Sequence, residues 1–307
     1  MTATTDRWVA AGGDANKLSL YKTIGSMAVF ANGDSRCMAG VHPDLPHIGA
    51  VGDWVGDASV RLAAESWLRA QGCSTARGPM ELCTWFPYRA NLGPDREPTF
   101  AMEPTETADR WLAAGYEQAT HYASAFIHHN TQIQKAYDPA AKLAMRGWRV
   151  ESLEADANGG LSEGRFREVV GIVHRTSTLA FADAYGFAPI PEEALQSLYA
   201  PYRAFIDPAY LMIAFAPDGQ VGGFAFALPD FLNPGLNRLL VKTLAVIPKY
   251  QGIGLGLWLV GTVHKTAADR GLDTAIHCLM WSDSRSVGLT REGDRIIRRY
   301  GLFEKPL

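Results

Sequence analysis

The chain has 307 residues, a length typical of about two domains, and apolar residues make up 47% of it, which excludes a disordered protein. Its formal net charge of −3 excludes a broad basic surface for nucleic acid or anionic lipid. No stretch approaches the roughly 18 uninterrupted apolar residues of a membrane-spanning helix, so we expect neither a nucleic-acid partner nor a membrane.

Predicted elements of the N-terminal part alternate between strands and helices. Apolar and polar residues alternate over 26–31, and the Asn-Gly-Asp at 32–34 favours a tight turn, which predicts a hairpin with the following strand. A helix begins after Asp57, a typical N-cap residue, because apolar residues follow at helical spacing. Up to residue 130 we expect strands at 26–31, 37–41, 74–78 and 121–128 and helices at 57–70 and 107–114.

The C-terminal part continues the alternation after a helix-prone connector over 130–146, which we expect to be interrupted at Asp138-Pro139. The turn residues at 217–220 (PDGQ) predict a second hairpin, and an apolar run at 239–246 predicts a buried strand. Here we expect strands at 148–153, 211–215, 221–228, 239–246, 274–280 and 298–303 and helices at 164–176, 191–205 and 255–270. Their order predicts an α/β fold around a mixed sheet.

A glycine-rich hexamer, QGIGLG at 251–256, lies between the predicted strand ending at Val246 and the helix starting near Leu255. Glycines let backbone amides turn inward without Cβ clashes, and a helix N-terminus favours negative charge, so the hexamer is a candidate anion-binding loop. Its spacing is neither G-x-G-x-x-G nor that of a Walker loop, which lends no support to a dinucleotide or nucleoside triphosphate site. From these residues alone, glycines that merely pack a helix on a strand are an equal alternative.

Residues 243–254 (TLAVIPKYQGIG) resemble the acyl-CoA-binding signature of the GNAT acyltransferase superfamily, a strand ending in V-x-P followed by Q/R-x-x-G-x-G/A. The resemblance covers about residues 146–303. It implies a mixed-sheet GNAT fold in which acetyl-CoA or another acyl-CoA binds between two splayed parallel strands, without a metal. The cosubstrate-binding residues that it implies are Leu244, Ala245 and Val246 for the pantetheine arm, and Gln251, Gly252, Ile253, Gly254, Leu255 and Gly256 for the pyrophosphate loop.

The N-terminal part looks like a degenerate second copy of this fold, as in tandem GNAT proteins. Its counterpart of the phosphate loop, at 47–53, lacks the V-x-P lead-in and contains Asp53, which would repel a diphosphate. We therefore expect a degenerate GNAT-like lobe at 1–130, a connector at 131–145 and one acyl-CoA-binding domain at 146–307. The N-terminal lobe would form substrate-side walls or the surface of a homodimer.

The catalytic residues usual in GNAT enzymes, an Asn at the end of the strand after the loop-helix and a Tyr in the next helix, are not at their places here. The segment WSDSRS at 281–286 has no Asn, and Tyr300 occurs one strand later, as the remaining candidate acid. Thr243 and His277 are polar residues inside the two apolar strands that, by the resemblance, border the acyl group. Each alone would more often be a core residue, but together they are the best catalytic candidates.

Thr243 and His277 are also similar in position to the Thr and His with which GNAT-like loading domains of polyketide synthases decarboxylate a malonyl thioester. That resemblance implies that Thr243 orients the acyl carbonyl and His277 protonates the carbanion; in a transfer reaction His277 would instead deprotonate an amine. The leading hypothesis is acyl transfer from acyl-CoA, or from an acyl carrier protein, to a small amine or thiol. Two alternatives stay open: decarboxylation of malonyl-CoA or a malonyl-carrier protein, and a non-catalytic acyl-CoA sensor.

Other histidines and cysteines carry weaker signals. His128 and His129 are neighbours on an expected strand and would point to opposite faces, so we do not expect them to chelate. For the same reason Cys278 would point away from the face of His277. The cysteines are spaced 36, 10 and 195 residues apart, which fits neither a zinc site nor a disulfide framework, and the first residues lack a secretory signal, so we expect a reduced, cytoplasmic enzyme.

Overall fold

Strands from both halves of the chain join in one mixed sheet. The computed structural model describes residues 4–93, 97–153, 155–156, 159–282 and 295–307. In these ranges the strand order is β1-β2-β3-β4-β12-β6-β11-β10-β9-β8-β7, and β5 pairs with β12 beside this path. The strands are β1 Ser26–Asn32, β2 Ser35–Val41, β3 Ile48–Val55, β4 Thr75–Gly78, β5 Ala90–Asn91, β6 Glu117–His128, β7 Arg149–Ser152, β8 Leu211–Phe215, β9 Val221–Pro229, β10 Arg238–Val246, β11 Thr274–Trp281 and β12 Arg295–Pro306. The predicted α/β fold around a mixed sheet is confirmed.

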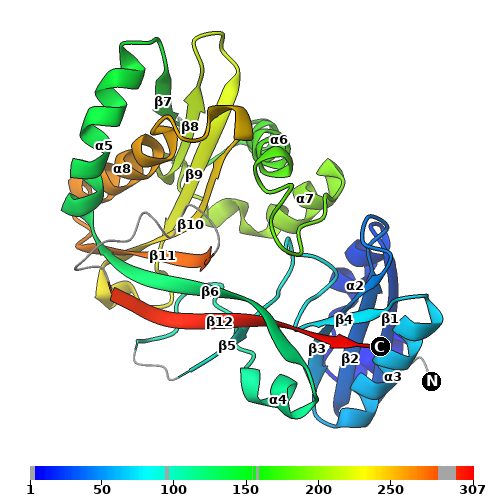
Figure 1. The fold of residues 1–307 in the computed structure, drawn as a ribbon. Coiled ribbons are helices and arrows are strands. Elements are labelled where there is room, and N and C mark those ends of the chain that lie inside the picture. The colour runs from blue at the N-terminus through cyan, green and yellow to red at the C-terminus, as the bar shows by residue number, and fades with distance from the viewer. Residues whose placement is uncertain (1–3, 94–96, 154, 157–158, 283–294) are drawn as a thin grey trace.

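Helices cover both faces of the C-terminal part of this sheet (Figure 1). The α-helices of the described chain are α1 Thr5–Ala10, α2 Ala15–Lys22, α3 Ala58–Ala70, α4 Ala108–Ala113, α5 His129–Ala144, α6 Glu163–Ala180, α7 Glu192–Tyr199 and α8 Leu255–Asp269. On one face, Leu143 of α5 and Leu259 of α8 share a core with Val241 of β10. On the other, Phe166 of α6 shares a core with Ala245 of β10. None of the described helices has both the length and the apolar character that crossing a bilayer requires.

Two long strands link the halves of the molecule. β6 comes from the N-terminal half but pairs with β11, while β12 comes from the end of the chain and pairs with β4 as well as with β6. Figure 1 shows β6 and β12 running side by side between the helices of the C-terminal part and the strands and helices of the N-terminal part. The division at residues 130 and 146 stays a prediction, and the sheet itself is continuous across it.

Two local predictions are wrong. Residues 47–53, taken as the counterpart of a phosphate loop, lie mostly in β3, where Gly49 and Ala50 pair with β2 on one side and β4 on the other. Asp53, at a φ of 47°, accepts a hydrogen bond from Arg36 Nε at 2.8 Å instead of facing a ligand. The expected interruption at Pro139 is absent as well, since α5 continues through this proline as a helix.

Candidate active site

The parallel strands β10 and β11 separate in the middle of the sheet. They pair in register from Arg238/Thr274 to Val241/His277 and no further. Each strand carries an irregularity just beyond that point, between Val241 and Thr243 on β10 and between His277 and Met280 on β11. Extra residues of this kind bend a strand away from its neighbour. The splayed parallel strands implied by the GNAT resemblance are therefore present.

The glycine-rich loop connects β10 to α8 and leaves its amides free. Gly252 and Gly254 have φ values of 82° and 94°, which favour glycine. Within the described chain, the amides of residues 252–254 donate no hydrogen bond, and α8 begins after Gly254 without a side-chain cap. A Cβ added at Gly254 would lie 2.7 Å from Cβ of Pro139. The loop and the first turn of α8 thus form a cradle of free N–H groups that fits a diphosphate.

Backbone and side chains around the loop agree with its predicted role in part. Leu244 and Val246 lie on the α8 side of β10, within contact distance of a Cβ added at Gly256. Gln251, expected to take part in the loop, donates a hydrogen bond from Nε2 to the carbonyl of Val246 at 2.9 Å and so holds the loop against the end of β10. β11 does not pair with residues 242–246, which leaves that edge of β10 open to an extended ligand arm.

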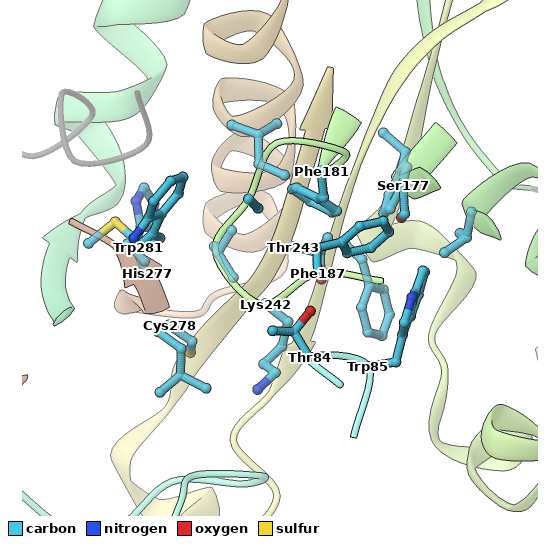
Figure 2. Close-up of a pocket in the computed structure, with 18 of the residues that line it drawn as sticks. Thr84, Trp85, Ser177, Phe181, Phe187, Lys242, Thr243, His277, Cys278 and Trp281 are labelled. Carbon is cyan, nitrogen blue, oxygen red and sulfur yellow. The ribbon is translucent and has the colours of Figure 1, made fainter. Parts of the chain in front are cut away.

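A cavity of about 330 Å³ opens at the point where the strands separate. Its walls come from α6 and the residues after it, from β10 and β11, and from the segment around Thr84 and Trp85 (Figure 2). Most lining side chains are apolar or aromatic. Of the residues predicted from the sequence, Thr243, Leu244 and His277 line the cavity, whereas Tyr300 does not.

Thr243 and His277 lie at the same opening but on opposite faces of the sheet. Thr243 shares its face with Ala245, which packs against α6, because alternate residues of a strand point the same way. His277 is on the other face, where its ring contacts α8. Figure 2 shows Thr243 beside Phe187 and His277 beside Trp281. The two side chains therefore do not face one another.

His277 is the first member of a chain of three buried histidines. Its Nε2 lies 2.9 Å from Nε2 of His264 on α8, and Nδ1 of His264 lies 2.9 Å from Nδ1 of His129, the first residue of α5. We call these residues the histidine trio. Their exposed fractions are 3%, 0% and 5% for His277, His264 and His129. Since His264 uses both ring nitrogens, the trio is a linear hydrogen-bonded chain, and no group of described residues has the arrangement of a metal site.

Burial keeps the trio neutral. Desolvation lowers the pKa of His277 to about 3, and the positive charge of Lys135 acts in the same direction. Burial likewise lowers the pKa of His264 well below its usual value and lowers that of His129, which the carboxylate of Asp273 partly offsets. At neutral pH each imidazole therefore has one N–H and one lone pair. Nδ1 of His277 makes no hydrogen bond with a described residue and is the nitrogen available to a substrate.

Tyr300 lies in the core between the two halves. Its hydroxyl donates to Glu103 and lies 3.2 Å from Oγ of Ser124, which accepts a hydrogen bond from the amide of Leu279 at 2.9 Å. Burial raises the pKa of Tyr300. Because Leu279 has a φ of 55° at the irregularity of β11, Tyr300 supports the bend that separates β11 from β10.

Cys278 and the segment after β11 complete the residues singled out from the sequence. Cys278 packs in the core on the face opposite His277, as expected, and burial raises the pKa of its thiol to about 12. Most of the segment at 281–286, where the usual Asn is missing, lies outside the described residues.

His264, Lys242 and Arg89 lie at the site but were not predicted from the sequence. His264 lies on the buried face of α8, and a lone histidine among Val260, Val263 and Ala267 was the available signal. Lys242 interrupts the apolar run of β10, and Arg89 is in the YR pair of residues 88–89, but nothing in the sequence shows that both line one cavity.

Comparisons with known proteins agree with this geometry. Residues 177–292 match the acetyltransferase (GNAT) family, and no curated protein matches the chain. A conserved protein from Enterococcus faecalis V583, described as a probable N-acyltransferase, has a similar structure, with a TM-score of 0.55, 11% identity and coverage of 98% of this chain and 68% of that one. A GCN5-related N-acetyltransferase from Sphaerobacter thermophilus has a TM-score of 0.50 and 13% identity over 89% of this chain and 81% of its own.

A third similar structure is a GCN5-related glucosamine N-acetyltransferase region of a fungal multi-domain β-N-acetylglucosaminidase. Its TM-score is 0.51 at 13% identity, and the match covers 98% of this chain and 36% of that one. At such identities the structures share a fold rather than a substrate. Together with the splayed strands and the free loop amides, the match over residues 177–292 identifies this part of the chain as a domain of the GNAT acetyltransferase family.

Proposed function

We propose that the protein transfers an acyl group from acyl-CoA to an amine at the opening between β10 and β11. One observation carries this proposal: the cradle of free amides at Gly252–Gly256 follows the end of β10, and Thr243 and Leu244 of the same strand line the cavity. The cradle would bind the diphosphate of CoA, and the open edge of β10 would bind its pantetheine arm. The thioester would then lie where the strands separate, beside His277.

The loop favours CoA over a carrier protein as the donor. A carrier-bound phosphopantetheine has one phosphodiester, whereas CoA has a diphosphate that can accept several hydrogen bonds. The cradle supplies free amides from the loop and from the first turn of α8, more than one phosphate group needs.

His277 would act as the base. Acyl transfer to a protonated amine follows R–NH3⁺ + R′CO–SCoA → R–NH–COR′ + HS–CoA + H⁺, so one proton must leave the site. Neutral Nδ1 of His277 can accept one proton of the ammonium group, which frees the nitrogen lone pair to attack the carbonyl. As the C–S bond breaks, a second proton of that nitrogen passes to the thiolate and gives CoA thiol. Thr243, on the other face, would contact the acceptor side of the cavity.

Decarboxylation of a malonyl thioester has weaker support. The polyketide-type mechanism needs a Thr and a His on one acyl group, and here Thr243 and His277 lie on opposite faces of the sheet. A sensor that lacks catalysis also has weaker support, because the cavity beside the cradle is lined by His277, a candidate base.

Mass spectrometry distinguishes these functions. The protein is incubated with acetyl-CoA or malonyl-CoA and a mixture of small amines, and the products are compared with those of heat-denatured protein. We expect free CoA together with an acylated amine. Conversion of malonyl-CoA to acetyl-CoA without amine acylation would identify a decarboxylase, and binding of CoA with no turnover of any thioester would identify a sensor.

A further inference from the structure

The cavity holds two cations and, among its described lining residues, no acidic side chain. The cations are Lys242 and Arg89. Lys242 is half-buried and forms no ion pair or hydrogen bond within the described chain. Arg89 is 8% exposed, and its Nε is buried without a hydrogen-bond partner. A charge in an apolar cavity is unfavourable unless an opposite charge accompanies it, so this arrangement favours an anionic ligand.

Arg89 is held rigidly in place. Its guanidinium lies 3.9 Å from the ring centre of Tyr88 and 4.3 Å from that of Tyr122, and Nη1 donates to the carbonyl of Leu279 at 3.0 Å. Nη2 also donates to the hydroxyl of Tyr88. These contacts orient the group without neutralising its charge, since none of them is to a carboxylate.

The carboxylate whose charge acts on Lys242 is already bound elsewhere. Glu103 acts to raise the pKa of Lys242, but its two oxygens bind Arg298 and the hydroxyl of Tyr300. Burial is the largest effect on Lys242 and lowers its pKa, and the positive charge of Arg89 acts in the same direction. An anion between the two cations would relieve both effects.

Lys242 is also next to the proposed reaction centre. It is the first residue of β10 beyond the last pair with β11, and Thr243 follows it. Most of the remaining walls are apolar or aromatic and include Phe181 and Phe187 beside Thr243 (Figure 2). A carboxylate held by Lys242 would therefore lie a few bonds from the reacting carbonyl, with an apolar group behind it.

We propose that the acceptor is an amine that carries a carboxylate and an apolar side group, as an apolar amino acid does, and that Lys242 and Arg89 bind its carboxylate. This proposal rests on the proposed acyl transfer. A carboxylate on the acyl group of the donor would satisfy the same cations, so the test has to separate the two sources.

The test compares acids with their amides. With acetyl-CoA as donor, we expect kcat/KM for L-phenylalanine to exceed that for L-phenylalaninamide, and Lys242→Met to reduce the value for the acid roughly ten- to hundredfold while leaving the amide almost unchanged. Lys265→Met is the matched control, because Lys265 is exposed on α8 and paired with Asp269. Equal use of acid and amide by the wild type would overturn the proposal.

A second arm varies the donor. If Lys242→Met changes the preference for malonyl-CoA or succinyl-CoA over acetyl-CoA and not the preference for acid over amide, the carboxylate belongs to the donor and the acceptor proposal is wrong. Calorimetric titration of CoA-bound protein with L-phenylalanine needs no turnover. Binding that Lys242→Met weakens, in a protein that acylates no amine, would contradict the proposed function and still support the carboxylate site.

The histidine trio carries a second inference, which rests on the proposed acyl transfer but on other residues than the carboxylate site. Each of its two hydrogen bonds needs one N–H and one lone pair, and neutral His264 has a single N–H to give. Only two arrangements satisfy both bonds. In the first, His277 donates to His264 and His264 donates to His129; in the second, both directions are reversed. The arrangement therefore decides whether Nδ1 of His277 has a lone pair or a proton.

We propose that the trio relays the proton of the amine out of the site. Nδ1 of His277 accepts the proton, the Nε2 proton of His277 passes to Nε2 of His264, and the Nδ1 proton of His264 passes to Nδ1 of His129. The Nε2 proton of His129 then leaves, at a nitrogen that makes no hydrogen bond in the described chain. The negative charge of exposed Asp273 acts on His129 and would draw the proton toward that side of the molecule.

The relay fits the burial of the trio because all three rings are neutral before and after the transfer. An imidazolium confined to His277 would be strongly disfavoured at a buried site. Transfer of the Nε2 proton of His277 to His264 avoids this charged state. His264 and His129 would thus be positioning residues, which act on substrate only through His277.

His264→Gln tests the relay because glutamine can form hydrogen bonds but cannot pass a proton between two nitrogens. We expect kcat to fall at least about tenfold with KM for acyl-CoA unchanged, and the solvent deuterium isotope effect to lose its multiproton character. His129→Gln should act in the same way from the far end. The control is His42→Gln, since His42 is buried and bonded to the carbonyl of Pro189 but lies outside the cavity. Unchanged kcat in a folded His264→Gln protein would overturn the relay, as would an imidazolium at His264 in ¹⁵N spectra at pH 7.

Discussion

The two halves of the molecule contain the same unit, a strand, a helix and a parallel strand, and only one of these units is open. In the C-terminal half, β10 and β11 separate after Val241 and His277, and α8 begins at an uncapped glycine. In the N-terminal half, the unit is β3, α3 and β4, with β3 and β4 also parallel. Just beyond their last pair, the amide of Met80 donates to the carbonyl of Val51 at 2.8 Å and closes the gap.

The helix N-termini of the two units also differ, because α8 has no side-chain cap and α3 has one. The side chain of Asp57 caps α3 by accepting a hydrogen bond from the amide of Ser59 at 2.7 Å. That carboxylate occupies the place a phosphate would take and would repel one. The helix cap and the hydrogen bond across the strands are therefore the features that distinguish the closed unit from the open one. The comparison predicts one CoA site per chain.

The largest expected effect is on the open unit, where His277 has no counterpart in the closed one. His277→Ala should reduce kcat by roughly 10²–10⁴-fold, the range for loss of a general base, with little change in CoA affinity because the cradle lies elsewhere. Steady-state kinetics and calorimetry with CoA measure the two quantities. The control is Cys278→Ala, next in the strand but on the opposite face. If His277→Ala keeps full activity on every thioester tried, His277 is a core residue, and the difference between the open and closed units does not reflect catalysis by His277.

Stability in acid is the second prediction, and it concerns the buried trio. Lowered pKa values mean that the unfolded chain binds protons below about pH 6.5 while the folded trio stays neutral, so stability is lost as pH falls through this range. Each imidazole contributes up to about 1.4 kcal/mol per pH unit. Urea unfolding between pH 7 and 5 should show this slope, and His264→Met should reduce it, whereas exposed His47→Gln should not. Equal slopes for the two variants would contradict buried, neutral histidines.

The strand, loop and helix of the open unit could be predicted from the sequence because the residues that indicate them are contiguous. The V-x-P strand end, the glycines and the apolar helix are contiguous, and the structure has β10 and α8 within one residue of the predicted bounds. The trio was out of reach because His129 and His264 are 135 residues apart, and their contact depends on α5 packing against α8. Tyr300 could not be placed for a similar reason: it lies on β12, which pairs with strands of the other half. Asp53 was assigned to a counterpart of the phosphate loop, whereas pairing with β2 on one side and β4 on the other makes residues 48–55 the strand β3.

Gly254 tests the cradle with a smaller effect. Gly254→Ala would strain the backbone at a φ of 94° and press against Pro139, which distorts the loop amides. We expect CoA to bind roughly tenfold more weakly or worse, since left-handed backbone costs a residue with Cβ about 1–2 kcal/mol. Gly271→Ala is the matched control, because Gly271 has a φ of 79° and open space around it. Calorimetry should show a loss for the first variant only; equal affinity in both would place CoA elsewhere.

The smallest effect is expected in the closed unit. Asp57→Ala removes the cap of α3 and should lower the free energy of unfolding by about 0.5–2 kcal/mol, measured by urea denaturation. It should not create a second CoA site, because the hydrogen bond between Met80 and Val51 still closes the gap between β3 and β4. Calorimetry should therefore give one CoA per chain for this variant, as for the wild type. A stoichiometry of two in the wild type would mean that the closed unit binds CoA despite its cap, whereas two in the variant alone would mean that the cap by itself keeps CoA out.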